Sequence, residues 1–260
     1  MTSPILPHLI SDIIAGRIRV VDLTHTLEPR FPPIVLPPEF GQSAPVRIEE
    51  ISRYDARGPA WYWNNLSFGE HTGTHFDAPI HWITGRDLPQ NSTDTIPAER
   101  FIAGACVIDC SAEAAADADY LMGVDKLRAF EAAHGRIPPR SWVLMRSDWS
   151  RRTDPVAFQN MDDTGQHTPG PDVEAVRFLV DERDVIGFGT ETIGTDAGQA
   201  AHFRPPYPCH ALMHGSGRYG LQCLANLDLL PPTGAVIVAA PLKVRRGSGS
   251  PLRVLALVAT

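Results

Sequence analysis

Short apolar runs bounded by turn residues recur along this chain, and they predict buried β-strands. These runs are residues 19–26, 104–110, 142–146, 185–188, 235–240 and 253–258. The first of them also contains His25, which we interpret as a structural histidine. Runs of this length are typical of strands in a packed sheet rather than of membrane spans, which need about 20 apolar residues.

Three other segments have a helical pattern, namely residues 9–16, 124–134 and 171–182. The third begins with Pro171 followed by acidic residues, which suits the first turn of a helix. Strands and helices alternate only in part, so we expect an α/β fold in which helices flank a mixed sheet. No repeat and no linker divides the chain, and residues 1–260 are therefore expected to form a single domain.

Two further segments are not assigned to a helix or a strand. Residues 28–45 contain six prolines and predict a long irregular surface loop. The aromatic residues Trp61, Tyr62 and Trp63 lie just before the chemically richest part of the chain. Large aromatic side chains usually belong to a core, and we expect that here, whereas Trp82 is also placed to line a pocket.

Composition narrows the functional class. The net charge of −7 and the short Lys/Arg clusters give no cationic surface for nucleic acid. The first residues lack the basic segment of a secretory signal, so we expect a cytoplasmic protein without membrane association. Four cysteines form no metal-binding pair, and Cys106 and Cys110 are expected to be buried free thiols.

Residues 69–82 hold the densest cluster of chemically active side chains. His71, His75, Asp77 and His81 lie within eleven positions, although the whole chain has only ten histidines. Imidazole nitrogens and carboxylate oxygens are the ligands of borderline divalent metals such as Zn²⁺ and Mn²⁺. The alternative is a loop whose polar side chains are hydrogen-bonded and have no chemical role, and the density of the cluster argues against it. The chain contains no G-x-S-x-G motif of a nucleophilic serine and no H-E-x-x-H metal-binding helix, so neither of these chemistries has support.

Backbone geometry decides how three of these side chains can meet. On a helix, Asp77 would lie roughly 200° around the axis from His75. In a fully extended strand, His71 would lie about 13 Å from His75. The chain must therefore turn back between them, and Gly73 supplies the backbone freedom for that turn. His75 and Asp77 would then share one face of a short extended segment.

His81 follows Asp77 across a stiff segment that contains Pro79. A histidine close to a metal, but not bound to it, can move protons at neutral pH. We therefore expect His81 to act as a general acid and base. Cys223 and Trp82 are candidate residues of the same site, and His202 and His214, which have no motif around them, are treated as structural.

The stretch from His71 to His81 resembles the signature of the metal-dependent cyclase-like hydrolases, which include bacterial kynurenine formamidases and isatin hydrolases. Residues 21–24 and 210–227 extend the resemblance over most of the chain. It implies a swivelling β/β/α fold and a homodimer or larger assembly. It also implies that His71, His75 and Asp77 bind the metal and that His81 is the catalytic acid/base.

One departure from the family pattern bears on the number of metal ions. Where the two-zinc formamidases have a glutamate twelve residues after the second-site histidine, this chain has Gln222 after His210. A neutral amide ligates cations less strongly than a carboxylate and removes a negative charge. We therefore expect one metal. The resemblance to the isatin hydrolases implies that this metal is manganese in preference to zinc, with His210 and Gln222 lining the substrate pocket or supporting the ligands.

This departure favours the isatin hydrolase branch of the family. The expected reaction is hydrolysis of a small aromatic cyclic amide, isatin to isatinate, by metal-activated water with His81 as general acid/base. Two alternatives remain open at this point. One is an arylformamidase acting on N-formylkynurenine, and the other is a protein that binds a metal and an aromatic acid without turnover.

Overall fold

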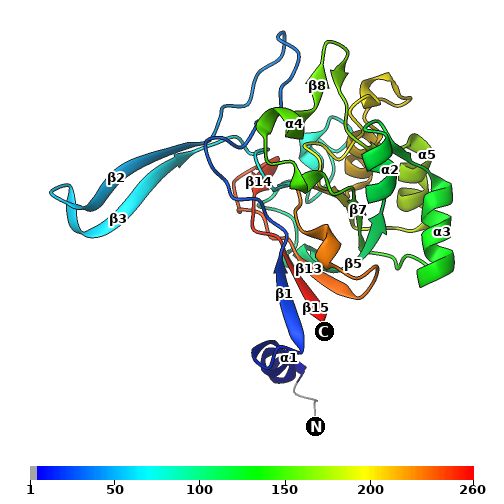
Figure 1. Cartoon of the computed structure of the whole chain (residues 1–260), viewed down its shortest axis with the longest axis horizontal. Helices are drawn as coiled ribbons and strands as arrows, with labels where there is room; N and C mark the ends of the chain where they lie inside the picture. The colour runs from blue at the N-terminus through cyan, green and yellow to red at the C-terminus, as the bar shows by residue number, and fades with distance from the viewer. Residues whose placement is uncertain (1–4) are drawn as a thin grey trace.

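The computed structural model describes residues 5–260, and a mixed nine-stranded sheet organises them (Figure 1). The strands occur in the order β1 (Ile18–Asp22), β15 (Leu255–Ala259), β13 (Ala235–Val238), β5 (Ile102–Asp109), β7 (Trp142–Arg146), β11 (Gly187–Thr190), β12 (Tyr219–Gln222), β4 (His75–Asp77) and β14 (Gly249–Pro251). The four consecutive strands β5, β7, β11 and β12 are parallel, and all other pairs within this nine-stranded sheet are antiparallel. The mixed sheet expected from the sequence is confirmed.

Helices and small hairpins surround this sheet. The helices are α1 (Ile5–Ile14), α2 (Ser111–Ala116), α3 (Val124–His134), α4 (Pro155–Gln159) and α5 (Val173–Arg177), which widens into the π-helix η4 (Phe178–Glu182). Short helical turns are η1 (Pro79–His81), η2 (Ala98–Phe101), η3 (Trp149–Arg151), η5 (Ala200–His202), η6 (Cys209–Met213), η7 (His214–Ser216) and η8 (Leu227–Leu229). Three two-stranded sheets pair β2 (Arg47–Asp55) with β3 (Gly58–Ser67), β6 (Leu121–Met122) with β10 (Gly170–Pro171), and β8 (Met161–Asp162) with β9 (Gly165–Gln166).

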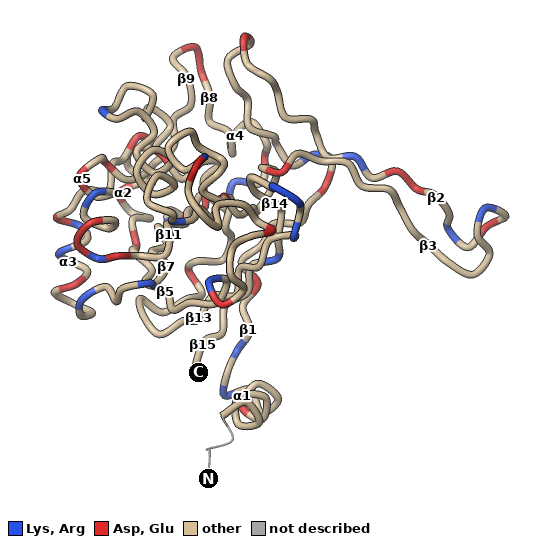
Figure 2. The backbone as a smooth tube through the Cα atoms, turned by 180° about the vertical axis from the view of Figure 1, so that it is seen from behind, with Lys and Arg blue, Asp and Glu red and all other residues tan. Residues whose placement is uncertain are grey.

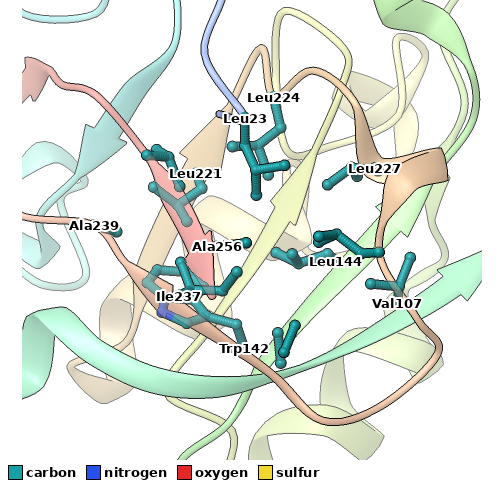
Figure 3. Close-up of a cluster of buried hydrophobic side chains, with 14 of the residues drawn as sticks. Leu23, Val107, Trp142, Leu144, Leu221, Leu224, Leu227, Ile237, Ala239 and Ala256 are labelled. Carbon is teal, nitrogen blue, oxygen red and sulfur yellow. The ribbon is translucent and has the colours of Figure 1, made fainter. Parts of the chain in front are cut away.

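Strand β7 shows how the sheet separates two cores. Successive side chains of a strand point to opposite faces. Trp142 and Leu144 belong to one buried cluster, and Val143 and Met145 belong to the other. The first cluster also draws residues from β1, β4, β12, β13 and β15, so the sheet curls around it (Figure 3). Helices α3 and α5 cover the second cluster on the outer face (Figure 1).

The hairpin of β2 and β3, here called the arm, extends away from the rest of the molecule (Figure 1). Trp61 and Trp63 lie on it with exposed fractions of 50% and 54%, so the expectation that they belong to the core is wrong. Their spacing of two residues is that of one strand face, and this pattern is the same whether or not another surface covers the face.

Expectations for the proline-rich segment and the cysteines agree with the structure. Residues 28–45 form no helix or strand, as their prolines predict, and all four cysteines are free and buried. Within residues 5–260 no helix is both long and apolar enough to cross a membrane. Figure 2 shows Lys and Arg interspersed with Asp and Glu along the chain rather than gathered on one side.

Removing the indole at the centre of the curled sheet should destabilise the fold. Trp142 is fully buried, and its ring meets those of Phe76 and Tyr219 at 6.5 Å. We expect Trp142→Ala to lower the free energy of unfolding by about 3–5 kcal/mol, because it leaves a cavity. Urea titration followed by circular dichroism measures the change. Val156→Ala, at a side chain that is 73% exposed, should change it by less than about 0.5 kcal/mol.

Candidate metal centre and active site

A turn at Gly73 brings His71 back over strand β4. Gly73 has a φ of +64°, a conformation that residues with a Cβ rarely adopt. Strand β4 then carries His75 and Asp77, and His71 Nδ1 lies 2.7 Å from Asp77 Oδ1. The predicted bend is therefore confirmed.

The neighbouring strands make room for these side chains. Strand β4 lies between β12 and β14, with Gly220 and Gly249 both opposite Asp77. A Cβ on Gly249 would lie 2.6 Å from the His71 ring, closer than non-bonded atoms allow. A glycine is thus required there for His71 to reach the carboxylate.

Asp77 is the centre of the cluster, and its carboxylate is fully buried. On the Oδ1 side, His75 Nε2 lies at 3.4 Å in addition to His71. On the Oδ2 side, the Gln222 amide donates a hydrogen bond, and Nε2 of His210 and His214 lie at 3.8 and 3.9 Å. Residues far apart in the chain therefore meet at one carboxylate.

Hydrogen bonds to the far ring nitrogens orient three of these imidazoles. His75 Nδ1 lies 2.8 Å from the Gly73 carbonyl oxygen, and His214 Nδ1 lies 3.0 Å from that of Arg218. A carbonyl only accepts, so both Nδ1 atoms must donate, and both Nε2 lone pairs face Asp77. His210 Nδ1 lies 2.5 Å from the Asp196 carboxylate, which sets its ring in the same sense.

Burial and charge act differently on these groups. Burial lowers the pKa of His75 and of His214 to about 4, against a weaker opposing effect of Asp77. Burial alone raises the pKa of Asp77, but His71 and its other histidine neighbours hold it well below the ordinary value. Burial also lowers the pKa of His210, and Asp196 outweighs this and raises it. At neutral pH a buried carboxylate therefore faces several uncharged imidazoles.

This donor set fits a divalent cation. His71, Asp77 and His81 offer ligand atoms within 4.8 Å of one another, and so do Asp77, His210 and His214. The buried Nε2 of His214 has no hydrogen-bond partner in the described chain, which leaves a lone pair open to a ligand. Burying an anion is costly, and a bound dication would offset that cost.

His81 and Trp82 lie at the edge of the cluster. The His81 ring stacks on that of His71 with centroids 3.9 Å apart. The Trp82 ring lies 4.8 Å from that of His210 and 5.7 Å from that of Tyr207. Flat apolar walls thus adjoin the histidines, where an aromatic ring can pack.

From the sequence, His214 was treated as structural. The structure places it in the cluster, because the side chain is buried with Nε2 facing Asp77. The spacing from His210 held a signal, since residues four apart on a helical segment share one face.

The candidate Cys223 and the histidine His202, which was treated as structural, both lie outside the donor groups. The Cys223 side chain packs in a buried cluster with Trp149 and Phe158, and its carbonyl accepts a hydrogen bond from Thr74 at 2.5 Å. His202 lies in the short turn η5, outside both donor groups.

Comparison with known proteins supports the family resemblance found in the sequence. Residues 21–197 match the family model described as putative cyclase. The chain is 50% identical to an isatin hydrolase of Roseibium aggregatum over 248 residues, which are 95% of this chain and 94% of that one.

Solved structures agree closely with this fold. Isatin hydrolase A from Ralstonia solanacearum has a TM-score of 0.98 at 63% identity and covers 99% of both chains. An isatin hydrolase bound to the product analogue thioisatinate has a TM-score of 0.98 at 48% identity over all of both chains. The swivelling β/β/α fold expected from the resemblance is thereby confirmed.

The amide of Gln222 should limit the number of ions bound. In Gln222→Glu, two carboxylates would meet without a donor between them, and a second cation would relieve the repulsion. We expect elemental analysis of the purified variant to give about two divalent ions per chain instead of one. Gln90→Glu adds the same charge at an exposed position and should leave the count unchanged. An unchanged count in Gln222→Glu as well would contradict this explanation of a single-metal site.

Proposed function

This chain belongs to the cyclase family of metal-dependent hydrolases, and on that premise we propose that it hydrolyses isatin to isatinate at the histidine cluster around Asp77. The single observation that carries the proposal is the convergence of His71, His75, His210 and His214 on one buried carboxylate, beside an aromatic edge. That arrangement suits a hydrolytic centre for a flat, apolar amide.

We propose His71, His75 and Asp77 as the residues that hold the divalent cation, which we take to be manganese rather than zinc. When bound, such an ion makes water easier to deprotonate and polarises a carbonyl group. Asp77 supplies the negative charge, and Gln222 orients its carboxylate by donating to Oδ2.

His81 is proposed to transfer the protons. Burial lowers its pKa well below the ordinary value, so the ring is uncharged at neutral pH and can accept a proton. The oxygen of water adds to the lactam carbonyl carbon, and His81 takes the proton that water loses. The carbon–nitrogen bond then breaks, and His81 delivers the proton to the leaving nitrogen. The product is an aromatic amine that bears a keto acid.

Substrate binding is assigned to the edge of the cluster. We propose that Trp82 packs against the benzene ring of the substrate, with His210 beside it. The Asp196 carboxylate fixes the orientation of the His210 ring, so that Nε2 faces the reacting centre.

The variant His81→Ala separates proton transfer from metal binding. We expect isatin turnover to fall by about 10²–10⁴-fold while the bound metal stays at the wild-type level. Absorbance of isatin measures the rate, and elemental analysis measures the metal. His134→Ala, a change outside the cluster, is the control and should leave both unchanged. Equal loss of metal and activity in His81→Ala would make His81 a ligand instead.

Assay of isatin and N-formylkynurenine on one preparation tests the substrate. Hydrolysis of isatin at a higher kcat/KM supports the proposal. Faster hydrolysis of the formyl amide would make the protein an arylformamidase. Binding of metal and aromatic acid without release of product from either compound would overturn the enzymatic assignment.

We also propose that the protein is a homo-oligomer, at least a dimer, in which the arm contacts a second copy. A two-stranded hairpin that projects alone into water is marginally stable. The charges of the arm are paired among themselves, as in the Arg53–Glu50 and Arg57–Asp55 ion pairs, and Trp61 and Trp63 share one exposed face. Helix α1 likewise has no buried residue.

Removing the two indoles tests this assembly. We expect the double change Trp61→Ser and Trp63→Ser to shift the mass measured by light scattering after size-exclusion chromatography toward that of one chain, because apolar contact area is lost. Val156→Ser, at a still more exposed site outside the arm, should leave the mass unchanged. A monomeric wild-type protein would contradict the proposal.

A further inference from the structure

A cavity lies apart from the histidine cluster, between the loop of residues 25–32 and the segment 150–158. Its volume is about 310 Å³, at the lower end of the range for small-molecule sites. Gln159 ties the two sides together by donating to the Pro33 carbonyl at 2.8 Å. None of the residues that converge on Asp77 lines this cavity. It is therefore a separate site.

Aromatic rings form one wall of the cavity. His25, Phe31 and Phe158 meet pairwise with centroids 5.5 to 5.8 Å apart, in tilted and edge-on arrangements. Such a wall presents ring faces and edges against which a planar apolar group packs.

Arg152 stands at the same cavity with no acidic partner. Its guanidinium lies 3.5 Å above the Trp149 ring and donates to the Ala157 carbonyl. Burial lowers its pKa, and no carboxylate of residues 5–260 opposes this effect. At the mouth, by contrast, Arg30 and Glu28 pair with each other at 3.4 Å. Of the two arginines at the cavity, only Arg152 lacks an acidic partner.

His25 adds a second unsatisfied group. Its buried Nε2 has no hydrogen-bond partner within the described chain. Burial lowers the pKa of His25, so the ring is uncharged at neutral pH. The Ser150 hydroxyl is not free in this way, because it donates to Glu191 at 2.7 Å. The cavity thus offers one cation without an acidic partner and aromatic walls.

We propose that this cavity binds an aromatic monocarboxylate, whose carboxylate pairs with Arg152 while its ring packs against Phe31 and Phe158. A guanidinium matches a carboxylate with two parallel hydrogen bonds. The product of the proposed reaction belongs to this chemical class. That connection rests on the proposed function, whereas the binding itself does not.

The site also contacts the catalytic segment through one side chain. The His25 backbone N–H donates to Thr74 Oγ1 at 2.9 Å, and Thr74 in turn donates to the Cys223 carbonyl. Thr74 immediately precedes His75 on β4. An occupied cavity therefore acts on the start of the strand that carries the cluster, and its ligand is a mixed rather than a purely competitive inhibitor.

Binding of 2-aminobenzoate to the metal-loaded enzyme, followed by isothermal titration, tests the proposal. Arg152→Gln should weaken one binding site about tenfold or more, because a charge-assisted contact is lost. Arg151→Gln removes a neighbouring charge that pairs with Asp148 outside the cavity and should bind as the wild type does. Benzamide, which has the same ring without the charge, should not occupy the site.

Two further measurements separate this site from the catalytic one. After metal removal by chelation, 2-aminobenzoate should still bind through Arg152 while turnover stops. Isatin hydrolysis without the ligand should be unchanged in Arg152→Gln, and the noncompetitive part of inhibition should disappear. Equal binding by both arginine variants, or loss of all binding on chelation, would overturn the proposal. Binding that depends on Arg152 in a protein inactive on isatin would leave it standing and refute only the proposed function.

Discussion

A single buried carboxylate imposes the strongest constraint on this molecule. Asp77 has no exposed surface, and burial keeps the nearby imidazoles of His75 and His214 uncharged at neutral pH. An ionised group in such surroundings is costly unless something compensates it. The fold holds the groups around Asp77 in place, since β4 pairs with β12 and β14 and the far ring nitrogens are hydrogen-bonded to carbonyls and to Asp196. The polar centre and the sheet are therefore one structural unit, and a bound divalent cation would offset the charge of Asp77.

Local signals in the sequence predict part of this structure well. Helix α3 and strand β7 coincide with the predicted residues 124–134 and 142–146, because each has a dense apolar pattern bounded by turn residues. The bend at Gly73 was also predictable, since two standard backbone conformations fail to bring His71 to Asp77 and only a turn remains. The resemblance to a known family supplied what spacing alone could not, namely the fold and the class of reaction.

What the sequence could not predict depends on contacts between distant segments. Trp61 and Trp63 alternate as core residues do, and only the position of the arm in space shows that no part of the described chain covers them. His214 looked structural because its functional neighbour, Asp77, is more than a hundred positions away in the sequence. The pairing of Arg152 with an aromatic wall has the same origin, because loop 25–32 and segment 150–158 carry no shared pattern. The periodicity of apolar residues shows which side of a helix or strand is apolar, but it does not show what packs against that side.

The placement of β4 between β12 and β14 has a consequence for the order in which the protein can mature. Strand β14 spans Gly249–Pro251, close to the last residue of the sequence, whereas His71 lies in its first third. Contacts of such large sequence separation form late, since their loop-closure entropy must be overcome first. During synthesis, the signature segment leaves the ribosome long before its two flanking strands exist. The cluster thus stays unassembled until residues 249–251 have emerged, because a shorter nascent chain lacks one of the two strands that hold β4.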